Sequence, residues 1–476
     1  MSVRRGRPRR SGGTSRLLAS VGALACAAGL LAGCTSGDRA SRTSASPSES
    51  ASTPSSSADG PVTLRFAVYG GPQEVASYRR VARAFTRTEP NVTVDVDVLP
   101  GADAAARTLD GEFRSGRAPD LFLTDAARLP QLVAERRVRP VDELLEARGV
   151  EFGDHYERLG LEAFAANASL QCMPDDVSPY VVYYNPALLQ PSSLALPGQP
   201  TPEPDVSGWT WAQFRRAVRQ VSTGPVKGVY LPPRLDVLTS LVRSGGADIV
   251  DDDQQPTTLT LDDATSRTVL GQVLRLARNP ALTPTSQELA HEDAVSRFAH
   301  GRLAMLVGTR AVVPRLRQAK DLIFDVYPLP SLGSASTVAD VRGYCIARAS
   351  RHVREAADFL AFASGDRGAS ITARSGAVVP ANLDVRSSEA FEQTDRMPVS
   401  QGLYGRVMRR ASTMPTAPAW PVLLRRTQPL VNRLFYAPVL DIDAVLAQMD
   451  RMSSRILRQP SQSPSPSASP TASAGG

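Results

Sequence analysis

Residues 62–125 alternate strand-like and helix-like patterns, and this alternation constrains the fold more than any other feature of the chain. Residues 92–98 alternate valine with threonine or aspartate, a period of two that is typical of a β-strand. Residues 62–68 and 118–125 indicate two further strands, and apolar residues at helical spacing fill the two intervals. This order of strands and helices predicts an α/β fold with a doubly wound sheet.

The stretch Cys172–Asn185 separates this region from a second one, residues 186–341. It begins as a polar, proline-bounded turn and continues into the β-branched and aromatic run Tyr180–Tyr184, which predicts a strand. In the second region, Thr210 precedes a run with helical spacing, so its hydroxyl is a candidate N-cap. The length of 476 residues allows two or three domains.

The formal net charge of +7 is concentrated at one end of the chain. Residues 1–33 hold six of the 54 basic residues and no acidic residue, and the other 48 nearly balance the 47 acidic ones. The positive charge is therefore no argument for nucleic-acid binding. An apolar run over residues 17–31 follows the arginines, and this order is typical of a secretory signal peptide over residues 1–33.

The tetrapeptide Leu31–Cys34 resembles the bacterial lipobox and predicts a diacylglyceryl lipid on the thiol of Cys34; a chance cysteine after the signal is the alternative. After the lipidated cysteine, residues 34–60 are rich in Ser, Thr, Pro and Ala, as are residues 459–476, so we predict a disordered linker and a disordered tail. The protein is then exported and anchored in the lipid bilayer at the outer face of the cell membrane.

Signatures of catalysis or metal binding are missing from the sequence. It contains no G-x-S-x-G elbow, and neither Lys227 nor Lys320 follows a serine by three residues. The four histidines show no H-x-x-x-H or C-x-x-C pairing, and Asp251–Asp253 lacks the glycine and glutamate of a calcium loop, so a solvated hairpin turn is the better interpretation. We predict no catalytic residues, no metal, no cofactor and no enzyme activity.

Several segments in a fixed order resemble the family 1 extracellular solute-binding proteins, the capture subunits of ABC importers. The resemblance covers most of residues 61–458 and rests on order and spacing together. The segments include an Ala-Pro-Asp-Leu-Phe strand, a Pro-to-Tyr-Tyr-Asn crossing segment, an F-x-x-G-R-x-A-M motif and a second crossing segment; they are residues 118–122, 172–185, 298–305 and 342–346.

The resemblance implies a two-lobed fold of the periplasmic-binding-protein type II kind, in which each lobe is a doubly wound sheet and crossing strands form a hinge. In this sequence the implied N-lobe is residues 61–171 and 346–385, the hinge 172–178 and 342–345, and the C-lobe 179–341 and 386–458.

A ligand cleft between the lobes is implied as well, and a cleft that binds sugar combines aromatic faces with polar groups of fixed geometry. For each candidate the alternative of core packing, helix capping or a surface ion pair stays open. The candidates are Tyr69, Asp125, Asp176, Ser178, Arg310, Arg342, Gly343, Tyr344 and Trp420.

The chain departs from the family pattern at Arg310, which stands where the family usually has tryptophan. A guanidinium group favours carboxylate or phosphate, so an acidic or modified sugar is one hypothesis for the ligand. Cys172 stands where the family usually has glycine. Because Cys172 and Cys345 both fall in crossing segments that run side by side in the family, the resemblance implies a disulfide between them; two buried free thiols are the alternative.

The function implied is capture of a small molecule, a carbohydrate by family, through hinge closure and its delivery to the transmembrane permease subunits of an ABC importer. The protein is expected to act as a monomer. Two alternatives stay open: a lipoprotein of the same fold that serves as a sensor or envelope scaffold, and an enzyme on this scaffold, against which the missing signatures argue.

Overall fold

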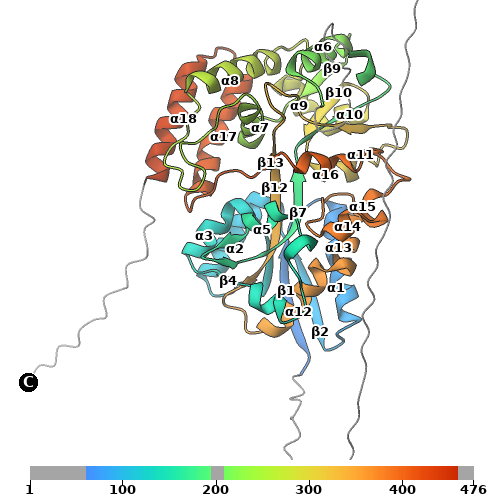
Figure 1. Ribbon diagram of the computed structural model, residues 1–476, viewed down its shortest axis with the longest axis vertical. Coiled ribbons are helices and arrows are strands. Elements are labelled where there is room, and N and C mark those ends of the chain that lie inside the picture. Colours follow the sequence, from blue (N-terminus) through green and yellow to red (C-terminus); the bar gives the residue numbers. More distant parts are fainter. Residues whose placement is uncertain (1–59, 195–207, 459–476) are drawn as a thin grey trace, which may run out of the picture. The chain divides into compact units, whose positions relative to one another are not determined.

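The computed structural model describes residues 60–194 and 208–458 (Figure 1). The predicted signal peptide, Cys34 with the linker up to residue 59, and the predicted tail over 459–476 lie outside the described residues. Within the described ranges, no helix has the length and apolar character needed to cross a membrane.

The first sheet is formed largely by the region with alternating strands and helices. Its strand order is β13-β12-β3-β1-β2, and both β4 and β7 also pair with β12. The pairs β1–β2 and β1–β3 are parallel, whereas β12 runs antiparallel to β3, β4 and β7. The strands are β1 (Val62–Val68), β2 (Val92–Val98), β3 (Leu121–Asp125), β4 (Val138–Arg139), β7 (Met173–Pro179), β12 (Thr337–Ala347) and β13 (Ala411–Ser412).

Helices α1 and α2 follow β1 and β2, as the order of apolar residues predicts, because each helix buries one apolar stripe against the sheet. A short hairpin of β5 (Ala165–Ala166) and β6 (Ser169–Leu170) precedes β7. The helices of this part are α1 (Pro72–Thr86), α2 (Ala102–Arg114), α3 (Leu129–Ala134), α4 (Asp142–Glu146), α5 (Arg158–Ala163), α12 (Val353–Ser364), α13 (Asp366–Ala373), α14 (Leu383–Arg386), α15 (Glu389–Glu392) and α16 (Leu403–Met408).

The second sheet has the order β11-β8-β10-β9, with β8 antiparallel to both neighbours and β9 parallel to β10. Thr210 caps α6 as predicted, since its hydroxyl accepts a hydrogen bond from the backbone N–H of Gln213. The elements are β8 (Val181–Tyr184), β9 (Lys227–Tyr230), β10 (Leu303–Gly308), β11 (Asp325–Tyr327), α6 (Trp211–Val221), α7 (Leu235–Ser244), α8 (Ala264–Ala277), α9 (Ser286–His291), α10 (Ala294–Ala299), α11 (Val313–Leu316), α17 (Trp420–Tyr436) and α18 (Ile442–Leu457).

Two crossing strands, β7 and β12, link the sheets (Figure 1). They pair antiparallel from Ala339 opposite Pro179 to Tyr344 opposite Met173, with a register shift between Arg342 and Gly343. One residue after β7 the chain enters β8 of the second sheet, whereas β12 also pairs with β3 of the first. The predicted hinge segments, residues 172–178 and 342–345, lie in this strand pair, apart from Cys172, which directly precedes β7.

The buried apolar residues form two clusters. One joins the first sheet to α1, α12, α13 and α16 and continues onto one face of β8 and β10 through Tyr183 and Leu306. The other covers the opposite face, with Val182 and Met305, under α6, α7, α8, α17 and α18. Successive strand residues face opposite clusters, so the second sheet is covered on both faces. Two sheets with their own helices confirm the predicted α/β class.

Candidate binding cavity

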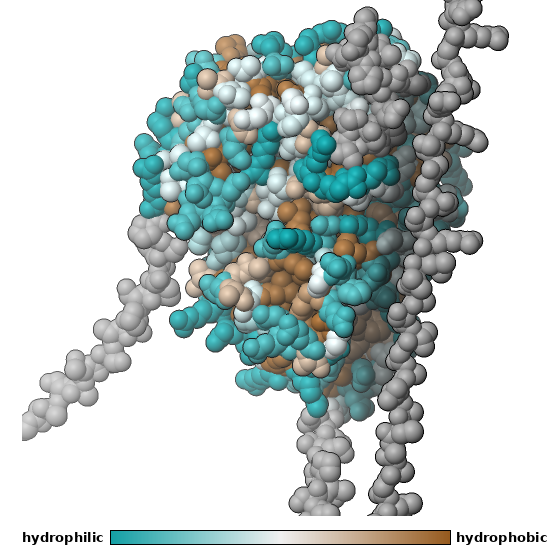
Figure 2. Space-filling model, viewed as in Figure 1, coloured by the Kyte–Doolittle hydropathy of each residue, from teal (hydrophilic) through white to brown (hydrophobic). Residues whose placement is uncertain are grey.

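A cavity of about 900 Å³ lies beside the crossing strands. Its walls come from both parts of the fold. The first part contributes the end of β3 with α3, the α5–β5 segment and residues 339–341 of β12, and the second contributes two loops, residues 254–257 and 413–418. In the face shown in Figure 2, apolar residues gather over the α3 to α5 part of the surface. The volume is in the range of small-molecule sites.

The lining combines aliphatic side chains with a few oxygen and amide groups. Leucine, valine, proline, alanine and methionine form most of the wall, and Asn167, Gln254 and Gln255 contribute amides. Three carboxylates line the cavity, namely those of Asp125, Glu162 and Asp340. No lysine, arginine, histidine or aromatic residue is among these lining residues, all of which belong to the described part of the chain.

The loop over residues 254–257 is held by the acidic turn before it. The Asp251 carboxylate accepts hydrogen bonds from the backbone N–H groups of Thr257 (2.9 Å) and Thr258 (3.1 Å). Asp252 accepts from the backbone N–H groups of Gln254 and Gln255. Pairing of Val250 with Leu259 closes the hairpin, so the predicted turn is present, and it positions amide side chains at the cavity.

Asp125, at the carboxyl end of β3, is the one predicted ligand residue that lines the cavity. Its carboxylate accepts a hydrogen bond of 2.6 Å from the hydroxyl of Tyr69, which directly follows β1 and is buried. Burial raises the pKa of Tyr69 well above its ordinary value, so the phenol stays a neutral donor. The alternative of a helix cap is not realised, because the Asp125 side chain makes no cap hydrogen bond.

Asp340 on β12 is a cavity residue that the sequence did not single out. Arg342, two residues later on the same strand, pairs across to Asp125 on β3, so the three side chains share one face of the sheet. Burial, followed by the negative charge of Asp125, raises the pKa of Asp340 to about 7. No sequence motif marks Asp340, because its position at the cavity depends on the pairing of strands that are far apart in the chain.

Three of the other predicted residues form a polar network with Glu74. The Arg342 guanidinium lies 2.7 Å from a carboxylate oxygen of Glu74 and 2.7 Å from one of Asp176, and all three side chains are buried. Asp176 also accepts hydrogen bonds from the hydroxyl of Ser178 (2.6 Å) and the backbone N–H of Val379 (2.7 Å). Arg342, Asp176 and Ser178 therefore bind one another and do not line the cavity.

Arg310 occupies a different place from the one expected. Its side chain is 0% exposed and stacks over the ring of Phe391, with the guanidinium carbon 4.0 Å from the ring centroid. It donates hydrogen bonds to the side-chain oxygen of Gln401 and to the carbonyl of Phe391. Cation–π stacking explains how an arginine is held in the core, and it leaves Arg310 away from the cavity lining.

The last three predicted residues are also packed in the interior. Tyr344 lies edge-on to Phe66 and Tyr78 in the first core. Gly343 is needed for close approach, since a Cβ atom there would come within 2.7 Å of the Met173 carbonyl oxygen. Trp420 is fully buried at the start of α17, just after the Ala417 and Pro418 that do line the cavity.

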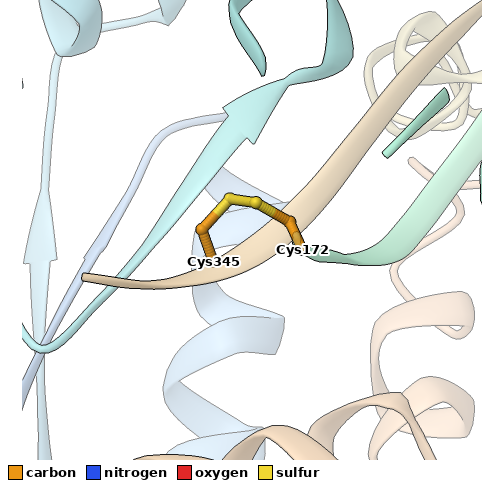
Figure 3. The surroundings of a disulfide bond; sticks show 2 residues. All are labelled: Cys172 and Cys345. Atoms are coloured by element: carbon orange, nitrogen blue, oxygen red, sulfur yellow. A yellow bond between two sulfur atoms is a disulfide. The ribbon is translucent and has the colours of Figure 1, made fainter. Parts of the chain in front are cut away.

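The predicted disulfide between Cys172 and Cys345 is present (Figure 3). The two Cα atoms are 4.4 Å apart, and both residues are fully buried. Cys172 directly precedes Met173 and Cys345 directly follows Tyr344, and these two neighbours form the last pair of the antiparallel ladder, so the bond joins the crossing strands at their first-sheet end. Free thiols, the alternative, are not what the structure contains.

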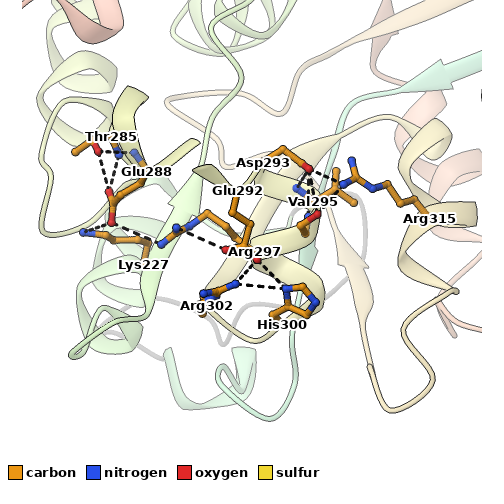
Figure 4. A network of polar contacts seen from close by, with 11 residues as sticks. Lys227, Thr285, Glu288, Glu292, Asp293, Val295, Arg297, His300, Arg302 and Arg315 are labelled. Atoms are coloured by element: carbon orange, nitrogen blue, oxygen red, sulfur yellow. Dashed lines mark hydrogen bonds and ion pairs between the residues drawn. The ribbon is translucent and has the colours of Figure 1, made fainter. Parts of the chain in front are cut away.

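A separate polar cluster lies around α9 and α10 (Figure 4). Glu288 is 3.4 Å from Lys227 and 3.6 Å from Arg297, and Glu292 accepts from His300 at 2.7 Å. His300 is mostly exposed and serves as a partner of a carboxylate. Among the described residues, no group of three or more His, Cys, Asp or Glu side chains is arranged to hold a metal ion.

Asp175 gives the fold a testable pH dependence. Burial raises the pKa of its carboxyl from 3.8 to about 7, and its oxygen lies 3.3 Å from the Tyr78 hydroxyl. Between about pH 4 and 7 the folded protein therefore keeps a proton that the unfolded chain releases, and stability falls as the pH rises. We expect Asp175→Asn, measured by urea unfolding at pH 5 and 8, to reduce this loss by about 1 kcal/mol or more.

The exposed Glu146 on α4 provides the control for that measurement, because Glu146→Gln removes a carboxylate that faces solvent. Its pH dependence should match that of the unchanged protein. An Asp175→Asn variant that loses as much stability between pH 5 and 8 as the original would show that Asp175 does not hold the extra proton.

Comparison with known protein families identifies the family of this chain. Residues 70–370 match the family model described as bacterial extracellular solute-binding protein. The chain belongs to this family. The predicted family membership is confirmed, and the family is one of binding proteins rather than enzymes.

This solute-binding protein is similar to a lipoprotein of Streptomyces antibioticus described as uncharacterized and encoded in the oleD 5' region. The two are 25% identical over 321 residues, which are 65% of this chain and 68% of the relative. The fold of the present chain is similar to that of an ABC substrate-binding protein from Listeria monocytogenes in complex with cycloalternan. The TM-score is 0.74 and the identity is 16%, and the match covers 83% of this chain and 99% of the other.

A second solved structure is the GacH receptor of Streptomyces glaucescens, described unliganded and in complex with acarbose. Its TM-score is 0.69 at 17% identity, covering 84% of this chain and 99% of the receptor. At these identities the structural likeness shows the fold. It confirms the predicted two-lobed architecture of the solute-binding protein.

Proposed function

We propose that this solute-binding protein is the lipid-anchored capture subunit of an ABC importer, which encloses a sugar-like ligand in the cavity beside β7 and β12 and presents it to a permease. The observation that carries the proposal is the position of the cavity. Its walls come from both parts of the fold, and the crossing strands run along one side. A change in the angle of those strands would open or close it.

The proposal assigns the lobes and hinge as the sequence predicts them, with residues 172–178 and 342–345 as the hinge. Two structural relatives support a sugar-like ligand, because they are described in complex with cycloalternan and with acarbose. The lipobox-like tetrapeptide ending at Cys34 and the lipoprotein relative support anchoring at the outer face of the membrane. No binding step requires covalent chemistry.

Ligand-induced stabilisation tests the proposal. A ligand that binds only the folded protein at 100 times its Kd adds about 2.7 kcal/mol to the free energy of unfolding. We expect a panel of mono- and oligosaccharides to contain members that raise the Tm of the protein in a concentration-dependent manner. Calorimetric titration of those members should then give one site per chain.

Two further measurements address delivery and anchoring. Affinity purification of the tagged protein from detergent-solubilised membranes should recover permease subunits in the presence of the ligand. Mass spectrometry of the mature protein should find the lipid on Cys34. Ligand binding without any recovered permease would favour the alternative of a sensor, and a protein that no solute stabilises would contradict capture itself.

A further inference from the structure

The charge of the cavity wall is opposite to the one that the sequence suggested. An acidic sugar was a hypothesis because of Arg310, but Arg310 is stacked in the core, and Arg342, the other candidate arginine, is bound by Glu74 and Asp176. Neither lines the cavity, which instead presents the carboxylates of Asp125, Glu162 and Asp340. An anionic ligand would meet like charges with no cation among the described lining residues.

Within the described part of the chain, two of the three carboxylates have no cationic partner of their own. Glu162 pairs with Arg158 at 2.6 Å, and both side chains are largely exposed, so this pair is screened by solvent. Asp125 accepts from the neutral hydroxyl of Tyr69. For the carboxylate of Asp340, no hydrogen bond or ion pair is found among the described residues, although the residue is part-buried and the charge of Asp125 acts on it.

The cationic groups near Asp340 form ion pairs with other carboxylates. Arg342 on the same strand is shared by Glu74 and Asp176, and Arg234, before α7, binds Asp236 at 2.6 Å. Burial and the negative charge of Asp125 outweigh the positive charges of Arg342 and Arg234, which act in the opposite direction, and raise the pKa of Asp340. A cation placed between Asp125 and Asp340 would relieve this repulsion.

The rest of the wall indicates what the cation is attached to. No aromatic ring is among the described lining residues, so the stacking platform typical of neutral sugars is missing from this lining. Aliphatic residues such as Leu129, Val133 and Leu159 and the amides of Gln254 and Gln255 are present instead. This surface fits a ring system with C–H faces and hydroxyls.

We propose that the cavity selects an amine-bearing sugar, whose ammonium group lies between the carboxylates of Asp125 and Asp340 while its rings lie against the aliphatic wall. The inference rests on the proposed function and adds the class of ligand. The site is the whole cavity, in which the two carboxylates supply the charge recognition. A charge-assisted hydrogen bond to such a carboxylate contributes on the order of tenfold to hundredfold in affinity.

The test uses three sugars of matched ring number: kanamycin A as the cation, maltotriose as the neutral probe and trigalacturonic acid as the anion. Calorimetry and thermal shift at pH 7.5 and low salt should show kanamycin A binding at least tenfold more tightly than the other two. Per-N-acetylated kanamycin, which keeps the rings and loses the charge, should bind no better than maltotriose.

Asp340→Asn should weaken the binding of kanamycin A by tenfold or more without lowering the Tm of the free protein, because the amide is isosteric and removes a like charge. Glu146→Gln, the same type of change away from the cavity, should leave binding unchanged. Binding of maltotriose or trigalacturonic acid in preference to kanamycin A, or kanamycin binding that Asp340→Asn does not weaken, would overturn the inference and leave solute capture intact. Absence of binding by any sugar of any charge would count against capture as well.

Discussion

Replacing Arg342 by methionine is expected to lower the free energy of unfolding by about 3–5 kcal/mol. The guanidinium is 2.7 Å from the carboxylates of both Glu74 and Asp176, and Glu74 is only 3% exposed. Without Arg342 the two carboxylates stay buried without a counter-charge, and an uncompensated buried charge is among the most destabilising changes in a protein. Denaturant unfolding followed by circular dichroism measures the loss.

Arg267 provides a matched control, because it is half exposed and lies 3.6 Å from Asp443 at the surface. Arg267→Met should change the free energy of unfolding by less than about 1 kcal/mol. Adding Glu74→Gln and Asp176→Asn to Arg342→Met should recover part of the lost stability, since no buried charge is then left unpaired. A single Arg342→Met variant as stable as the Arg267→Met control would show that the network is not energetically coupled.

The second large effect is expected from the disulfide between Cys172 and Cys345, which closes a loop with a sequence separation of 173 residues. Linking positions so far apart restricts the unfolded chain, and the loss of such a bond lowers stability by about 2–5 kcal/mol. We therefore expect the double variant Cys172→Ala with Cys345→Ala to unfold at a markedly lower denaturant concentration. Equilibrium unfolding in urea, with and without reductant, measures the difference.

Reductant supplies an internal control for that measurement. The unchanged protein in dithiothreitol should approach the stability of the double variant, whereas the double variant itself should be insensitive to dithiothreitol. A fully buried bond is reduced slowly, so the samples need incubation in denaturant before refolding. Equal stability of the oxidised protein and the double variant would show that the crossing strands hold together without the bond.

The elements that local chemistry determines could be predicted from the sequence. The valines of β2 alternate because one face of the strand is buried, and Thr210 caps α6 because its hydroxyl reaches the N–H of a residue three positions later. Both patterns depend on neighbours within one element. The fold class followed from the order of such elements, and the family from the order of its motifs.

The candidate site was less predictable because its residues converge from distant parts of the chain. Arg310 was assigned to a cleft since it replaces an aromatic residue, but Phe391 and Tyr404 provide rings that hold it in the core. Asp340 carries no motif and becomes notable only because β12 places it near Asp125. Residue type alone does not show whether an arginine has found its partners inside the protein.

Because of the bond between Cys172 and Cys345, the final stability of the protein depends on the redox state of its surroundings. Such bonds form in oxidising surroundings and are rare where glutathione keeps thiols reduced. A newly made chain in the cell interior therefore lacks this disulfide and unfolds more readily, which would favour the export that we propose. In the export route that we propose, Cys172 and Cys345 therefore form their stabilising bond only after the chain has left the reducing cell interior.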